Sequence, residues 1–118
     1  MYGVPPNLNL SDYQNAACIQ VAVGEFQIQF HFQPAATVYV EGRWELRDGQ
    51  GQLVDQSVEN HKRSSYQIHR IQGQTVVDSF VSAPASFGLK FANDYVLEVF
   101  DDSQEYETSQ LSPSGVII

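Results

Sequence analysis

Residues 26–33 alternate strictly between apolar and polar side chains, and this pattern limits the possible folds more than any other part of the sequence. The apolar positions are Phe26, Ile28, Phe30 and Phe32. The polar positions between them are Gln27, Gln29, His31 and Gln33. A period of two places successive side chains on opposite faces of a strand. The pattern therefore predicts a half-buried strand with Phe26 and its three partners facing inward. Pro34 ends this strand because proline has no backbone N–H for the ladder.

Similar patterns predict that most of the chain is antiparallel β-structure. The expected strands cover residues 18–23, 38–46, 52–55, 75–81, 87–91 and 95–99, with a closing hairpin from Leu111 to residues 116–118. The strand over 38–46 is expected to continue through Gly42 with a bulge or bend there. Asp48-Gly49 and Asn93-Asp94 are typical of the tight turns that join antiparallel strands.

One segment has a different period. Ile68 and Ile71 lie three residues apart, and Gly73 is well placed to end a helix, so we expect a helix near residues 62–71. The predicted fold class is α+β: mostly antiparallel β with seven or eight strands, sandwich or barrel-like, with this short helix packed on a face. Pro5-Pro6 and the polar residues after it predict an irregular N-terminal arm over 1–15, followed by a single domain over 16–118.

The charge balance excludes several functions. The chain has 14 Asp and Glu against 6 Lys and Arg, a formal net charge of −8. Binding to nucleic acid or to an anionic membrane surface requires clustered cations, which are missing here. The start of the chain has no export signal, and no apolar run reaches the roughly 18 residues of a membrane span. With a single cysteine as well, we expect a cytoplasmic protein without disulfides.

The acidic residues are concentrated at the end of the sequence. Residues 91–118 contain six carboxylates and no lysine or arginine: Asp94, Glu98, Asp101, Asp102, Glu105 and Glu107. This segment is expected to be a solvated loop or an acidic protein-binding surface. In the second case, the charged contacts are Asp101, Asp102, Glu105 and Glu107. Tyr106 is then either an aromatic anchor or a core residue.

Other chemistry finds little support in the sequence. Oxygen ligands at 101, 103 and 105 copy the start of a calcium loop, but Tyr106 stands where that loop needs glycine. His31, His61 and His69 are expected at the surface, and His61 and His69 are too far apart in sequence for one zinc site on a helix. Cys18 lies in an apolar stretch and is expected to be a buried hydrophobe. We therefore predict no metal, no cofactor, no catalytic residue and no enzyme activity.

Two segments resemble a group of small uncharacterised bacterial domains. The similarity rests on residues 89–97 and 100–107, together with residues 42–46 and Gly51. Some members of that group are similar to immunity proteins encoded beside toxins. The resemblance covers most of the chain and implies protein binding, with a basic protein toxin as the partner. Many of those domains have glycine in the turn where this chain has Asp94.

Two alternatives to an immunity protein remain open. One is a structural module that forms homo-oligomers through exposed strand edges, and the sequence does not decide the oligomeric state. The other is a small-ligand-binding barrel whose cavity is lined by Phe26, Phe30, Trp44 and Phe91.

Overall fold

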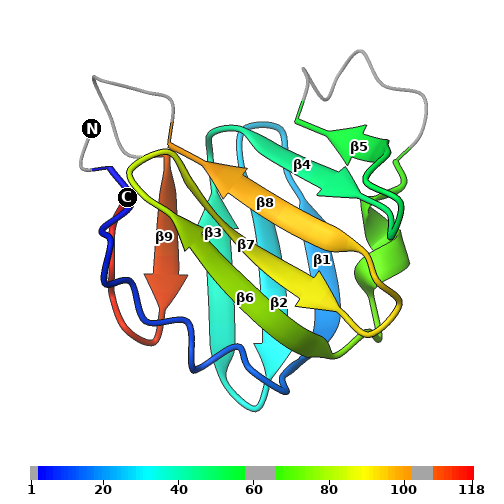
Figure 1. Cartoon of the computed structure of the whole chain (residues 1–118), viewed down its shortest axis with the longest axis horizontal. Helices are drawn as coiled ribbons and strands as arrows, with labels where there is room; N and C mark the ends of the chain where they lie inside the picture. The colour runs from blue at the N-terminus through cyan, green and yellow to red at the C-terminus, as the bar shows by residue number, and fades with distance from the viewer. Residues whose placement is uncertain (1–2, 58–65, 102–107) are drawn as a thin grey trace.

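The computed structural model describes residues 3–57, 66–101 and 108–118, and it contains two antiparallel sheets packed face to face (Figure 1). The first sheet has the order β1-β2-β3-β9, with β1 Ala17–Val23, β2 Ile28–Gln33, β3 Ala36–Val40 and β9 Ser109–Ser112. The second has the order β5-β4-β8-β7-β6, with β4 Trp44–Arg47, β5 Leu53–Gln56, β6 Val76–Ser82, β7 Ser86–Phe91 and β8 Val96–Phe100. The prediction of mostly antiparallel β is confirmed, as a sandwich with nine strands in the described residues.

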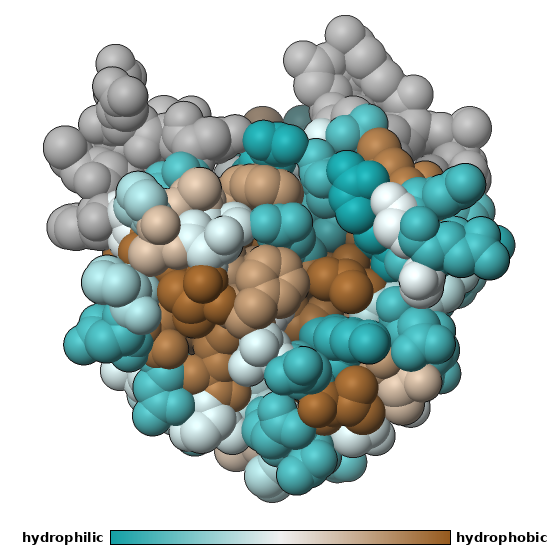
Figure 2. All heavy atoms as spheres, in the orientation of Figure 1, coloured by the Kyte–Doolittle hydropathy of each residue, from teal (hydrophilic) through white to brown (hydrophobic). Residues whose placement is uncertain are grey.

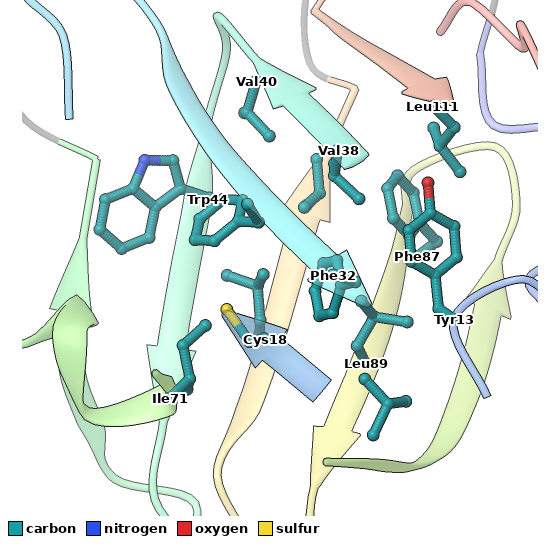
Figure 3. Close-up of a cluster of buried hydrophobic side chains, with 14 of the residues drawn as sticks. Tyr13, Cys18, Phe32, Val38, Val40, Trp44, Ile71, Phe87, Leu89 and Leu111 are labelled. Atoms are coloured by element: carbon teal, nitrogen blue, oxygen red, sulfur yellow. The ribbon is translucent and has the colours of Figure 1, made fainter. Parts of the chain in front are cut away.

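The hydrophobic core lies between the two sheets. In β2, Ile28, Phe30 and Phe32 are buried while the residues between them are partly exposed, as the alternation predicts. Phe30 meets Trp44 of the other sheet edge to face at 6.4 Å between ring centroids, and Phe32 stacks on Phe91 at 6.4 Å. Figure 3 shows side chains from both sheets pointing toward one another across this layer. These contacts leave the interior filled with apolar side chains.

The N-terminal segment belongs to this core, although it contains no strand in residues 3–15. It runs along one end of the sandwich in Figure 1 and buries Val4, Leu10 and Tyr13. The Tyr13 hydroxyl lies 2.9 Å from the Thr37 carbonyl oxygen and 3.2 Å from that of Ser112. Burial raises the pKa of this hydroxyl, so it stays protonated and donates to these carbonyls. The segment thereby ties β3 to β9.

The chain itself covers the edges of the first sheet. At β1, Ala17 pairs with Thr75, and the Val21 N–H donates to the Gln72 side chain at 3.0 Å. At β9, Gln110 pairs with Ile117, and residues 116–118 return alongside the strand. The bridge at Ala17 also joins the first sheet to the start of β6 in the second.

The expected single strand over 38–46 is wrong, because β3 and β4 belong to different sheets. The chain crosses between the sheets at Glu41 and Gly42, whose N–H groups donate to the Thr108 carbonyl oxygen at 2.9 and 3.0 Å. A Cβ atom on Gly42 would lie 2.8 Å from the Thr108 Cβ. Glycine is therefore required here for close packing against Thr108 rather than for a bulge.

The helix expected near 62–71 is also wrong over the described residues, where only a 3₁₀-helix, η2 (Ile68–Ile71), forms. Residues 62–65 lie outside the described residues. Ile68 and Ile71 are both buried, and their spacing of three fits the three residues per turn of a 3₁₀-helix. Asp55 of β5 accepts the N–H groups that start it, from Gln67 and Ile68, at 2.8 Å each. Across the described residues, no helix has the length and apolar character needed to cross a membrane.

Candidate functional site

The acidic residues of 91–118 that the structure describes do not gather in one patch. Asp94 lies in the turn before β8, Glu98 lies within β8, and Asp101 directly follows it. The five residues of β8, which rise about 3.3 Å each, separate the turn that holds Asp94 from Asp101 at the other end of the strand. The other predicted contacts, Asp102, Glu105, Tyr106 and Glu107, are outside the described residues, so their role stays a prediction.

Each of these three described carboxylates has a contact within the protein. Asp101 accepts a hydrogen bond from the Gly3 N–H at 2.6 Å and so holds the N-terminal segment. Glu98 accepts one from the Ser86 hydroxyl at 2.5 Å, and Asp94 lies 4.0 Å from the Lys90 ammonium. Asp101 is the only predicted binding residue that the described part of the chain includes, and it is half-buried.

The outer face of the second sheet carries an ion-paired cluster. Glu45 accepts hydrogen bonds from Arg43 at 2.6 Å and from Arg47 at 2.9 Å, and the Arg43 guanidinium lies 4.1 Å above the Phe100 ring. Figure 2 shows this face, with hydrophilic and hydrophobic side chains interspersed over it. Because the two arginines already pair with Glu45, this cluster has the character of a structural network.

Phe26 is the residue that the alternation misplaced. It was expected to face the core, but β2 begins two residues later, and the Phe26 side chain is 81% exposed. Val23 pairs with Ile28, and the Gly24 N–H donates to the Gln27 carbonyl oxygen at 2.8 Å. Glu25 and Phe26 therefore form the two-residue loop of a tight hairpin, with the aromatic ring at its tip. We call residues 24–27 the hairpin tip.

A surface hollow of about 90 Å³ adjoins the hairpin tip. Its lining residues come from the β1–β2 turn, the β3–β4 crossing and the end of β5: Val23, Glu25, Phe26, Gln27, Ile28, Val40, Glu41, Gly42, Trp44 and Ser57. Among these are two carboxylates and neither lysine nor arginine. Thr108, the first described residue after the acidic segment 102–107, contacts this lining through Glu41 and Gly42.

The four aromatic residues expected to line a barrel cavity lie in two different places. Phe30, Trp44 and Phe91 are buried in the core between the sheets, whereas Phe26 lies at the surface. The four aromatic residues therefore do not line one interior cavity.

The other titratable groups give no second candidate in the described residues. Cys18 is fully buried, as expected, and burial raises the pKa of its thiol to about 11. His31 is half-buried on the outer face of the first sheet, His69 is exposed, and His61 lies outside the described residues. No group of three or more His, Cys, Asp or Glu side chains suited to a metal ion occurs in 3–57, 66–101 and 108–118.

Comparison of this chain with protein-family models, with curated proteins and with solved structures gives no match.

Proposed function

We propose that the protein is a binding module that captures a positively charged protein partner at the end of the sandwich that carries Phe26. The observation that supports this proposal most is the 81% exposure of Phe26 at the tip of a tight hairpin, beside a surface hollow. Soluble proteins bury most large aromatic side chains, and aromatic residues are enriched in interface cores. Covering a Phe side chain fully contributes roughly 1.5–3 kcal/mol.

The charge around Phe26 defines the partner's chemistry. Glu25 and Glu41 flank the ring and are both exposed, and the chain carries a net charge of −8. Complementary charge steers a basic protein toward such a surface and raises the association rate at low salt. An anionic ligand would be repelled by the same groups.

The acidic segment extends this proposal toward an immunity protein that masks the active site of a basic toxin. The segment 102–107 follows Asp101 at the end of β8 and leads into Thr108. Thr108 contacts Glu41 and Gly42, two residues that line the hollow. In this proposal, Asp102, Glu105 and Glu107 add to the charge around Phe26. Tyr106 is then a second aromatic contact.

A binding role is proposed in preference to catalysis because of the size of the site. The hollow beside the hairpin tip has a volume of about 90 Å³. Pockets that enclose a small-molecule substrate usually measure roughly 300–1,000 Å³. A shallow hollow beside an exposed ring suits a side chain of a protein partner better than a substrate.

The proposal is tested with three immobilised forms of the protein: the wild type, Phe26→Ala and Phe80→Ala. Phe80, on β6 of the second sheet, is a matched control because its side chain is also exposed, at 40%. Proteins retained from the source cells are compared by quantitative mass spectrometry, and a basic partner is then purified for affinity measurements. We expect the wild type and Phe80→Ala to retain it, and Phe26→Ala to bind it at least about tenfold more weakly, or about 1.4 kcal/mol.

Two further measurements separate the parts of the proposal. Raising salt from about 50 to about 500 mM should slow association, because it screens exposed charges. A partner retained equally by Phe26→Ala and the wild type would overturn the hairpin tip as the site. A double variant with Asp102→Lys and Glu105→Lys should associate with the basic partner more slowly than the wild type does at the same salt concentration. An unchanged rate would remove the acidic segment from the proposal while leaving Phe26 in place.

A further inference from the structure

The first sheet differs from the rest of this acidic protein in having no carboxylate, lysine or arginine in its strands. β1, β2, β3 and β9 contain no Asp, Glu, Lys or Arg. Every strand of the second sheet contains at least one. A solvent-facing surface without these residues is unexpected in a chain with 14 carboxylates.

The outward positions of β2, β3 and β9 are polar and lie in register, whereas β1 also exposes Ile19, at 50%, and pairs Ala22 with Gln29. Gln29, Tyr39 and Gln110 stand abreast across β2, β3 and β9. A second row lies two residues further along the strands. In it, Gln20 of β1 pairs with His31 of β2, His31 with Thr37 of β3, and Thr37 with Ser112 of β9. The face therefore presents amides, hydroxyls, an imidazole and a phenol ring. We call these seven residues the neutral face.

A chain of hydrogen bonds runs from Thr37 and His31 of this face through Gln29 to Gln27 and Glu41 beside it. His31 Nδ1 lies 3.1 Å from Thr37 Oγ1, and His31 Nε2 lies 3.0 Å from Gln29 Oε1. The Gln29 amide oxygen can only accept, so Nε2 donates to it, and in the neutral imidazole Nδ1 then accepts from the Thr37 hydroxyl. Gln29 Nε2 then donates to Gln27 Oε1 at 2.6 Å, and Gln27 Nε2 donates to Glu41 Oε1 at 3.4 Å. The donors all point toward Glu41, and each amide keeps one N–H and one lone pair for a ligand.

An aromatic ring and a small hollow lie beside these amides. The Tyr39 ring meets the His31 ring edge to face at 6.5 Å. A hollow of about 40 Å³ is lined by Tyr39, Glu41, Thr108, Ser109 and Gln110. Since one water needs roughly 10–15 Å³ of such volume, this hollow has room for a group the size of a hydroxymethyl.

We propose that the neutral face binds an uncharged oligosaccharide. Sugar hydroxyls both donate and accept, which matches the Gln29 amide of this face and the adjoining Gln27 amide, each with one donor and one acceptor left. The C–H face of a sugar ring packs on an aromatic ring such as Tyr39, and an uncharged ligand needs no opposite charge. A protein partner fits this face less well, because interface cores are enriched in aromatic residues, Met and Arg rather than amides.

This site adjoins the hairpin tip, with which it shares Gln27, and it shares Glu41 with the hollow beside Phe26, but it does not include Phe26 itself. The hydrogen-bond chain reaches the hollow beside Phe26 only at Gln27 and Glu41. Oligosaccharide binding is therefore expected to survive the Phe26→Ala change, so the two proposals fail or succeed independently.

The test follows backbone and side-chain amide signals of ¹⁵N-labelled protein by NMR during titration with cellohexaose, xylohexaose and maltohexaose at millimolar concentration. At least one of these neutral probes should shift the Gln29 and Gln110 side-chain signals and the backbone signals of β2, β3 and β9. Tyr39→Ala should weaken this binding at least about tenfold, or about 1.4 kcal/mol. Tyr95→Ala is the matched control, because Tyr95 is also half-buried but lies in the turn before β8.

Gln110→Ala provides a second variant, with an exposed side chain, in case Tyr39→Ala does not fold. No shift with any of the three probes would overturn the proposal, as would shifts centred on the second sheet. Equal binding by the wild type and both face variants would also overturn it. Shifts of the neutral face that follow protein concentration alone would instead identify a second copy of the chain as the occupant and reject the oligosaccharide.

Discussion

Glu45 shows how a single side chain is held between opposite charges. Its side chain is 9% exposed, while those of Arg43 and Arg47 are 47% and 42% exposed. The hydrogen bond from Arg43 is the main cause that lowers the pKa of this carboxyl, and Arg47 lowers it further. Burial acts in the opposite direction but does not outweigh the two arginines.

This lowered pKa predicts a pH-dependent contribution to stability. A carboxyl whose folded-state pKa is depressed stabilises the fold fully above its unfolded value, about 4.3, and loses that contribution as pH falls through the folded value. Glu45→Gln should cost about 1 kcal/mol at neutral pH, since the arginines are partly exposed. The difference from the wild type should shrink toward about pH 2, as measured by urea unfolding.

Asp78→Asn is the matched control for Glu45→Gln, because Asp78 lies on an outer strand of the same sheet and contacts no arginine among the described residues. At neutral pH, Asp78→Asn should cost less stability than Glu45→Gln, because it removes no contact with an arginine. A Glu45→Gln difference that stays constant from neutral to acid pH would contradict the ion-pair explanation.

Phe26 marks the limit of pattern-based prediction for a single residue. The alternation that correctly places Ile28, Phe30 and Phe32 inward also includes Phe26, because a period of two continues past the end of a strand. The pairing of Val23 with Ile28 leaves only Glu25 and Phe26 for the loop between Gly24 and Gln27. The point at which β2 begins depends on its pairing with β1, and the sequence of β2 alone does not reveal that pairing.

Among the strands, β6 and β7 are joined by a contact between an aromatic ring and a glycine. Phe80 pairs with Gly88, and a Cβ on Gly88 would lie 2.2 Å from the Phe80 Cε1. The ring therefore lies over the glycine backbone, which compensates for the missing side chain in the strand. No larger residue fits at position 88 while the ring stays there.

A double-mutant cycle tests this contact. Gly88→Ala should destabilise the protein by about 1 kcal/mol, because the new methyl group displaces the Phe80 ring into solvent. In a Phe80→Ala background the same change should be neutral or stabilising by up to about 1 kcal/mol, since alanine costs less backbone entropy than glycine. Chemical unfolding of the four proteins gives the coupling energy. Equal effects of Gly88→Ala in both backgrounds would show that the ring does not depend on the glycine.

Local patterns predicted the strands better than they predicted the connections between them. Period-two alternation located β2, β7 and β8 to within about two residues. It did not show that the chain changes sheets between Val40 and Trp44, because both residues face the same core and the alternation is uninterrupted. The spacing of Ile68 and Ile71 fits one face of an α-helix, but three residues are also the repeat of a 3₁₀-helix, so the spacing does not distinguish the two.

The N-terminal segment is part of the cooperative fold. Leu10 is buried, and the Tyr13 hydroxyl connects to β3 and β9. Leu10→Ala should lower the free energy of unfolding by about 2–3 kcal/mol, within the range for buried leucine. Trp44 fluorescence and far-UV circular dichroism should report the same shifted midpoint. Asn7→Ala, an exposed residue of the same segment, should change stability by less than about 0.5 kcal/mol.

An arm that packs independently of the sandwich would give another result. Leu10→Ala would then leave the unfolding midpoint of Trp44 unchanged, because that residue lies between the two sheets.

The distribution of charge over the fold was only partly predictable. The sequence shows the acidic residues of 91–118 close together, but an extended strand separates neighbours in sequence, so Asp94, Glu98 and Asp101 are spread along β8. The glutamines, in contrast, come from strands that are distant in sequence and meet on one face through the sheet register. Only the pairing of β2 with β3 and of β3 with β9 brings Gln29 and Gln110 to the same row.

Other segments of the chain pair with the edge strands β1 and β9 of the first sheet, and this restricts how other proteins can bind there. Open β-edges invite intermolecular strand addition, which is the start of many fibrils and of β-augmentation complexes. Here Thr75 and Ile117 already fill backbone positions beside β1 and β9. A partner that binds the first sheet must then contact its side chains rather than add a strand at these positions. The same pairing protects the sheet from fibril growth through its backbone.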